Sequence, residues 1–249
     1  MHFIEIGEGD RPSVVFAHGW GRSHHDFIPA AESLGATARS MLVDLPGFGQ
    51  TPRPDVAWDT RQYADYIASF LAEQGIGRVI WVGHSFGGRI GLRLARHHPD
   101  LLGGLIVVAG AGMPRQRVYF ERVRNDLRRR QFRVLKWLAG ADEARRDALE
   151  KRFGSPDYVE SKRLGLRDIF LATIAEDQSP DLPDITVRTE LLYGAKDGET
   201  PVEIGQRMAA LIPGARLTIF PEYDHFSILN RGHHVIALRA KALLAERAS

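Results

Sequence analysis

The chain contains no cysteine among its 249 residues. This absence excludes disulfide bonds, thiolate metal sites and a cysteine nucleophile, and it is compatible with a reducing cytoplasm. Residues 1–12 lack the basic region and the apolar run of a secretory signal peptide, and no apolar run in the sequence is long enough to cross a membrane. We therefore expect a cytoplasmic protein that does not span a membrane.

Sequence signatures for metal and nucleotide binding are also missing. No H-E-x-x-H pair and no clustered spacing of histidines and carboxylates occurs, and no P-loop lysine follows the glycines at positions 87 and 88. Few aromatic residues interrupt the basic part of the chain, which argues against a nucleic-acid surface. We expect no cofactor, no metal ion and no nucleic-acid partner.

Positive and negative charges balance over the whole chain but not locally. The net charge is +2 overall, whereas residues 113–139 hold nine basic and two acidic residues, a net charge of +7. Apolar residues from Leu127 to Leu138 recur at helical spacing and leave the arginines on the outer face of a predicted helix. That face is either simply solvated or recognises an acidic partner. The candidate contacts for such a partner are Arg124, Arg128 and Arg129.

Continuous apolar runs alternate with helical patterns along most of the chain. Strands that are apolar without alternation indicate a parallel sheet that is buried on both faces. The runs lie at residues 13–19, 40–47, 78–85, 102–110, 187–194 and 215–222, and residues 3–6 are a candidate outer strand. The sequence therefore predicts an α/β fold with helices on both faces of a mostly parallel sheet.

This alternation stops between residues 112 and 183. The segment has no convincing strand, and its apolar residues recur at helical spacing among arginines. Because it lies between two predicted strands, it would hang above the carboxyl edge of the sheet, where open α/β sheets bind ligands. We expect a first core part at residues 1–111, a helical cap at 112–183 and a second core part at 184–249.

A serine stands in the turn between one predicted strand and the helix that follows it. In the segment GHSFG, residues 83–87, the glycines two positions either side of Ser85 let strand and helix approach closely. A serine nucleophile needs a histidine base and a carboxylate that orients the histidine. Asp197 and His225 each follow a later predicted strand. All three side chains are therefore expected at one edge of the sheet, in the chain order serine, acid, histidine.

Several segments resemble the α/β-hydrolase family of serine esterases over essentially the whole chain. They are FAHGWG, VDLPGFGQT, VGHSFGG, LLYGAKDGETP and DHF. More narrowly, HGWG, LVDLPGFG, IWVGHS and LYGAKDG look like esterases that cleave the methyl ester of pimeloyl-acyl carrier protein in biotin synthesis. The resemblance implies Ser85 as nucleophile, Asp197 as acid and His225 as base. It also implies an oxyanion hole made by the backbone N–H groups of Trp20 and Phe86, which would stabilise negative charge on the carbonyl oxygen.

Taken together, these features favour a serine carboxylic-ester hydrolase that works through an acyl-enzyme. Pimeloyl-acyl carrier protein methyl ester is its candidate substrate, and an acyl carrier protein docked on the basic cap is its candidate partner. A C–C bond hydrolase or an elimination lyase could use the same three residues. A ligand receptor could retain the pocket with negligible turnover.

Two further side chains near the expected site have two interpretations each. Arg89 follows Ser85 by one helical turn, and a structural ion pair is favoured over a contact to a substrate carboxylate. Asp224 precedes His225 directly, and a turn cap is favoured over a role in tuning the imidazole.

Overall fold

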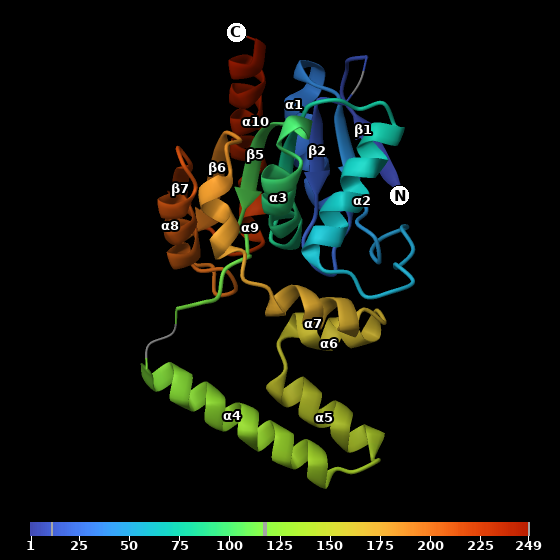
Figure 1. Ribbon diagram of the computed structural model, residues 1–249, viewed down its shortest axis with the longest axis vertical. Helices are drawn as coiled ribbons and strands as arrows, with labels where there is room; N and C mark the ends of the chain where they lie inside the picture. The colour runs from blue at the N-terminus through green and yellow to red at the C-terminus, as the bar shows by residue number, and fades with distance from the viewer. Residues whose placement is uncertain (11, 117–118, 249) are drawn as a thin grey trace.

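Seven strands form one sheet in this protein, whose computed structural model describes residues 1–10, 12–116 and 119–248. The strand order is β1-β3-β2-β4-β5-β6-β7; β1 runs antiparallel to β3, and all other neighbours are parallel. The strands are β1 (Phe3–Ile6), β2 (Val14–Ala17), β3 (Ser40–Val43), β4 (Val79–His84), β5 (Leu102–Val108), β6 (Thr189–Gly194) and β7 (Arg216–Phe220). The predicted α/β fold with a mostly parallel sheet is confirmed (Figure 1).

Helices cover both faces of this sheet, and each face has its own hydrophobic cluster. One cluster holds Val15 and Ala17 of β2, and the other holds Val14 and Phe16. Because neighbouring residues of a strand point to opposite faces, both faces of β2 are buried, which explains its uninterrupted apolar sequence. The first cluster is covered by α2 (Thr60–Glu73), α3 (Phe86–His97) and α8 (Val202–Leu211), and the second by α1 (Ile28–Leu34), α9 (Ser227–Asn230) and α10 (His233–Ala248).

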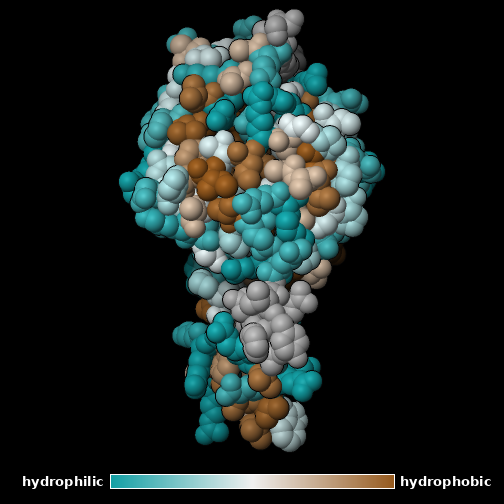
Figure 2. All heavy atoms as spheres, turned by 90° about the vertical axis from the view of Figure 1, so that its left-hand side faces the viewer, coloured by the Kyte–Doolittle hydropathy of each residue, from teal (hydrophilic) through white to brown (hydrophobic). Residues whose placement is uncertain are grey.

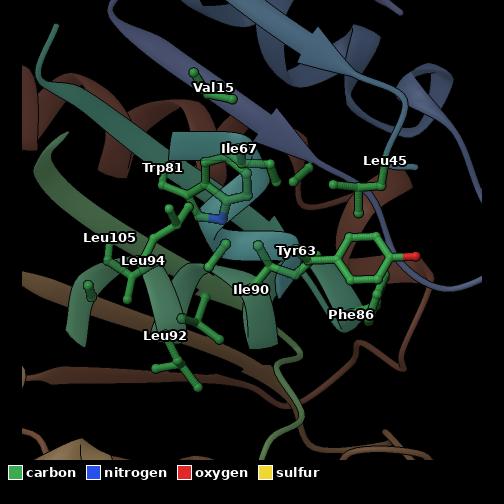
Figure 3. Close-up of a cluster of buried hydrophobic side chains, with 14 of the residues drawn as sticks. Val15, Leu45, Tyr63, Ile67, Trp81, Phe86, Ile90, Leu92, Leu94 and Leu105 are labelled. Atoms are coloured by element: carbon green, nitrogen blue, oxygen red, sulfur yellow. The ribbon is translucent and has the colours of Figure 1, made fainter. Parts of the chain in front are cut away.

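Trp81 of β4 belongs to the first cluster, together with Ile90 and Leu94 of helix α3 (Figure 3). Its side chain is fully buried, and its indole N–H donates a hydrogen bond of 3.0 Å to the carbonyl oxygen of Gly87. A Cβ atom on Gly91, one turn further along α3, would stand only 2.6 Å from the indole ring. Small residues on α3 therefore let the helix lie directly against β4.

Four helices lie between β5 and β6 and sit together beyond the carboxyl ends of the strands (Figure 1). We call them the cap: α4 (Tyr119–Leu138), α5 (Glu143–Phe153), α6 (Pro156–Arg163) and α7 (Arg167–Ala175). The buried side chains of Ile169 and Phe170 on α7 belong to the first core cluster. Helices α4 and α5 pack against each other and extend away from the sheet (Figure 1). The cap is thus joined to the core through its second half.

The apolar side of α4 differs from the expectation. Leu127, Val134 and Leu138 are 61 %, 55 % and 63 % exposed, and Trp137 is 78 % exposed. Helix α4 packs on α5, and these apolar side chains are exposed together with its described arginines. Figure 2 shows hydrophobic residues on the surface of the lower lobe of the molecule, where α4 and α5 lie.

The close approach of β4 and α3 gives a stability prediction. A Cβ atom on Gly83 would stand 2.2 Å from the carbonyl oxygen of Gly87, a contact that requires the backbone to move. We expect Gly83→Ala to lower the free energy of unfolding by about 1–3 kcal/mol, the usual cost of overpacking. Urea unfolding measures it. The matched control is Gly77→Ala just before β4, where a Cβ would meet nothing within 4 Å; equal losses for both variants would contradict the argument.

Candidate active site

Ser85 stands between β4 and α3 in a strained backbone conformation. Its φ and ψ angles are 47° and −102°, in a region that residues other than glycine rarely adopt. Three hydrogen bonds hold the turn. The N–H of Ser85 donates to the carbonyl oxygen of Val108 at 2.9 Å, and the N–H of Gly87 donates to the carbonyl oxygen of His18 at 3.1 Å. The indole N–H of Trp81 donates to the carbonyl oxygen of Gly87. The glycine-flanked turn that the sequence predicted is present.

Two backbone N–H groups near this turn are free of hydrogen bonds. In the described residues, neither the N–H of Trp20 nor that of Phe86 has an acceptor. Phe86 is the first residue of α3, where N–H groups have no partner within the helix and the helix dipole favours negative charge. The Phe86 ring anchors this end of the helix by packing edge-on to Tyr63 at 5.1 Å (Figure 3).

Asp197 and His225 form a buried hydrogen-bonded pair at the ends of β6 and β7. The Nδ1 atom of His225 lies 2.8 Å from Oδ2 of Asp197. The other carboxylate oxygen, Oδ1, accepts hydrogen bonds of 2.8 Å from the N–H groups of Glu199 and Thr200. Burial raises the pKa of Asp197, but the hydrogen bonds from His225 and Thr200 outweigh it and hold that pKa below its usual value. The acid is therefore ionised at neutral pH and fixes which ring nitrogen of His225 carries the proton.

A second histidine, His84, supports the backbone of His225. Its Nε2–H donates a hydrogen bond of 3.0 Å to the carbonyl oxygen of His225, and the two rings lie 4.7 Å apart. Burial and the neighbouring His225 lower the pKa of His84 to about 3, so it is neutral at physiological pH. Because His84 directly precedes Ser85, the turn that presents the serine also positions His225.

The loop after β2, which carries Trp20, is fixed by two buried groups. Nε2 of His18 accepts a hydrogen bond of 3.0 Å from the N–H of Leu45, and its Nδ1 lies 2.7 Å from the carbonyl oxygen of Gly19. Asp44 accepts hydrogen bonds from the N–H groups of His24 and Gln50 and from the rings of His24 and His2. Burial raises the pKa of Asp44, but these donors outweigh it and set that pKa at about 2.

Ser85 opens into a small cavity of about 140 Å³ between the core and the cap. Its lining residues come from the turns at Trp20 and Ser85, from helices α3, α6 and α7, and from the loop after β6. They include Trp20, Phe86, Arg89, Asp157, Phe170, Glu199 and Thr200. A wider cavity of about 780 Å³ shares several of these residues and continues under the cap, with Met113, Phe132, Phe153 and Ile174 among its apolar walls. The site is thus a narrow pocket beside a wider cavity whose walls are partly apolar and partly charged.

The structure brings together most of the side chains that the sequence singled out. Trp20, Ser85 and Phe86 line the small cavity, and the pair of Asp197 and His225 lies next to its wall residue Thr200, whose Oγ1 is 2.8 Å from Asp197 and 3.2 Å from the Nδ1 atom of His225. In the cap, the arginines point in different directions. Arg124 is exposed, Arg128 lies over the ring of Phe153 at 5.6 Å, and Arg129 lines the wide cavity.

The two side chains with open interpretations are also placed. Asp224 accepts hydrogen bonds from the N–H groups of Phe226 and Ser227 at 3.1 and 2.8 Å, which is the turn cap that was favoured. Arg89 does not form the expected ion pair with any residue in the described part of the chain. Its guanidinium donates to the carbonyl oxygen of Thr173 at 2.7 Å, because the nearby acid Glu176 pairs with Arg93 at 3.1 Å. Arg89 therefore links α3 to the cap helix α7.

Three residues at the site were not singled out from the sequence, and they are Asp157, Glu199 and His84. Asp157 of α6 and Glu199 both line the small cavity, and Oε2 of Glu199 lies 3.4 Å from Nε2 of His225. Burial, together with the charge of Glu199, raises the pKa of Asp157 to about 6. Only the position of Glu199 two residues after Asp197 could have suggested a role for it, and nothing local distinguishes Asp157 or His84.

One cluster of metal-ligand type occurs among the described residues, formed by His2, His24 and Asp44. The carboxylate of Asp44 already accepts hydrogen bonds from four donors, and none of the three residues lines the cavity at Ser85. This cluster therefore fits a structural role in holding the loop after β2. In the described ranges, no helix is both long and apolar enough to cross a bilayer.

Known proteins share this fold. A membrane phospholipase A, described as a bacterial virulence factor, superposes with a TM-score of 0.75 at 24 % sequence identity, covering 99 % of this chain and 83 % of that protein. The enol-lactonase from Burkholderia xenovorans superposes with a TM-score of 0.73 at 22 % identity, covering 98 % and 96 % of the two chains. At these identities the likeness establishes the fold.

Sequence comparison gives more specific relatives. A pimeloyl-[acyl-carrier protein] methyl ester esterase from Chromobacterium violaceum is 30 % identical, with 97 % of each chain covered. The enzyme of the same name from Vibrio vulnificus is 29 % identical over 90 % of this chain and 91 % of its own length. The profile of the alpha/beta hydrolase family matches residues 14–246. With its sheet order, its serine turn and a family match over nearly its whole length, the chain belongs to the alpha/beta hydrolase family.

Proposed function

We propose that the protein is a serine carboxylesterase that forms an acyl-enzyme on Ser85. The observation that carries this proposal is the hydrogen-bonded pair of Asp197 and His225 beside the cavity into which Ser85 opens. A strained, glycine-flanked serine next to a buried acid–histidine pair is the arrangement that acyl transfer requires. The relatives named above as esterases support the same reaction.

The first half of the reaction acylates the serine. Ser85 Oγ attacks the ester carbonyl carbon while Nε2 of His225 takes the hydroxyl proton. Asp197, bound at Nδ1, keeps the proton on that nitrogen and stabilises the imidazolium that forms. The unpaired N–H groups of Trp20 and Phe86 receive the carbonyl oxygen as it becomes negative; a single donor of this kind contributes roughly 3 kcal/mol. His225 then protonates the departing alcohol.

The second half releases the acid. Water attacks the acyl carbonyl with His225 again as the base, and the products are a free carboxylate and the regenerated serine. Residues 112–183 act in this proposal as a cap over the substrate chamber. The apolar walls of the wide cavity suit a carbon chain, while polar groups gather near Ser85.

The substrate proposal is finer. The relatives named for pimeloyl-[acyl-carrier protein] methyl ester suggest an acyl chain that is linked to a carrier protein. Acyl carrier proteins are acidic, and the sequence 113–139 carries a net charge of +7, with Arg115 and Arg129 of this segment lining the wide cavity. We propose that Arg124, Arg128 and Arg129 guide such a carrier, with the exposed apolar side chains of α4 beside them.

The nucleophile is tested by covalent labelling. An organophosphonate should modify Ser85 and abolish ester hydrolysis, and Ser85→Ala should lose turnover by several orders of magnitude because the acyl-enzyme cannot form. Intact-protein and peptide mass spectrometry locate the label. A burst of p-nitrophenol from an activated ester separates an esterase from a receptor with negligible turnover. Label on another residue, or an active Ser85→Ala variant, would refute the assignment.

The acid is tested by comparing two neighbouring carboxylates. Asp197→Asn should lower kcat by about 10⁴-fold, because the amide no longer fixes the tautomer of His225. Asp224→Asn is the control, since Asp224 is exposed and only caps a turn. Steady-state kinetics on p-nitrophenyl esters measure both. Similar losses for the two variants would mean that Asp197 is the wrong acid.

The carrier surface is tested by charge reversal. The double variant Arg124→Glu, Arg128→Glu should raise KM for an acyl-carrier-protein methyl ester at low ionic strength and leave a small p-nitrophenyl ester nearly unchanged. Exposed ion pairs contribute about 0.2–1 kcal/mol each, so the effect should weaken as salt increases. Arg129→Glu is measured separately, because Arg129 lines the chamber and can affect both substrates.

A matched control carries the same charge change on the neighbouring cap helix. Arg145 and Arg146 of α5 are exposed, so Arg145→Glu, Arg146→Glu alters the net charge equally. If this control raises KM as much as the α4 variant, the effect is one of net charge. If the carrier-linked ester responds to neither variant and shows no salt dependence, the basic segment is only a solvated helix face.

A further inference from the structure

A carboxylate lies close to the nitrogen of His225 that the reaction needs. Oε2 of Glu199 lies 3.4 Å from Nε2 of His225, on the side of the ring opposite Asp197. In the described part of the chain, no hydrogen bond joins Ser85 Oγ to His225. The imidazole therefore has a carboxylate near each of its two ring nitrogens.

Glu199 is placed so that a substrate can displace it. Its side chain is 47 % exposed and lines the same small cavity as Ser85. Only its backbone is fixed, through the hydrogen bond from its N–H to Oδ1 of Asp197 at 2.8 Å. An ester that reaches Ser85 enters the space that this carboxylate borders. The side chain can leave while the loop that holds Asp197 keeps its geometry.

Charged groups surround His225 on several elements. Asp197 and Glu199 come from the loop after β6, Asp157 from the cap helix α6, and Asp224 precedes His225 directly; the cations are Arg22, over the ring of Phe226, and Arg89 on α3. His84 is neutral. Burial lowers the pKa of His225, but Asp197, Glu199 and Asp157 together outweigh it and raise that pKa above its usual value.

We propose that Glu199 is a positioning residue whose carboxylate pairs with Nε2 of His225 before an ester arrives and leaves Nε2 to Ser85 when an ester fills the pocket. The proposal rests on the proposed esterase function. The carboxylate of Glu199 favours a proton on Nε2, and His225 can accept the serine proton only when that nitrogen is free.

Removing the Glu199 charge should therefore make the base available at lower pH. Glu199→Gln keeps the shape of the side chain and the backbone contact to Asp197 but no longer stabilises a positive imidazole. We expect the pKa of His225 to fall and the acid limb of kcat/KM to move to lower pH. Activity on the acidic side, relative to the plateau, should rise several-fold.

NMR titration of the His225 ring in a Ser85→Ala background measures the ion pair without any catalysis. His225→Gln identifies the signal by its loss. Glu199→Gln in this background should shift the titration to lower pH, and Glu199→Asp, whose shorter side chain withdraws the carboxylate, should give a smaller shift in the same direction. The control is Glu222→Gln, whose exposed carboxylate pairs with Lys196 and does not line the cavity.

The two readouts separate this proposal from the proposed function. The role of Glu199 is overturned if Glu199→Gln leaves the titration curve of His225 unchanged. It is also overturned if Glu222→Gln shifts that curve by the same amount. A kcat/KM profile whose acid limb does not move overturns it as well. If the protein hydrolyses no ester but the titration shifts as expected, the ion pair is real and the esterase assignment is what fails.

Discussion

The contact between strand β4 and helix α3 is the constraint on which the rest of the site depends. A Cβ atom on Gly83 would stand 2.2 Å from Gly87, and one on Gly87 would stand 2.2 Å from the carbonyl oxygen of Ala17. Three backbone segments meet here with no space for side chains. This crowding forces Ser85 into its positive-φ conformation and leaves the N–H of Phe86 free at the start of the helix.

Hydrogen bonds between neighbouring loops hold the other side chains of the site near this contact. Thr200 bridges the loops by placing its hydroxyl 2.8 Å from Asp197 and 2.9 Å from the carbonyl oxygen of Ala109, at the end of the neighbouring strand. His84 ties the backbone of His225 to the residue before the serine. The parallel strands bring these loops to one edge, and a few hydrogen bonds between loops then set their distances.

Local pattern was enough to predict the sheet, the serine turn and the loops that carry Asp197 and His225, because each depends on residues close in sequence. It was not enough for Glu199, Asp157 and His84, whose importance depends on side-chain direction across loops or on the position of the cap. The uncovered apolar side of α4 shows the same limit. Periodicity identifies the apolar face of a helix, but long-range packing decides what covers it. Arg89 donates a hydrogen bond to a carbonyl oxygen and not to an acid as expected, and the nearby acid Glu176 forms its ion pair with Arg93.

The two halves of the cap are under different constraints. Helix α7 shares the core cluster through Ile169 and Phe170, so its sequence is tied to folding. Helix α4 packs on α5, and most of its described side chains are exposed, so substitutions of these residues cost the fold little. Substitutions on α4 can thus alter one wall of the wide cavity, which Arg129 and Phe132 line, while the core that holds the serine, acid and histidine keeps its packing. In the cap, the pair of helices α4 and α5 is therefore less constrained by packing on the core than α7 is.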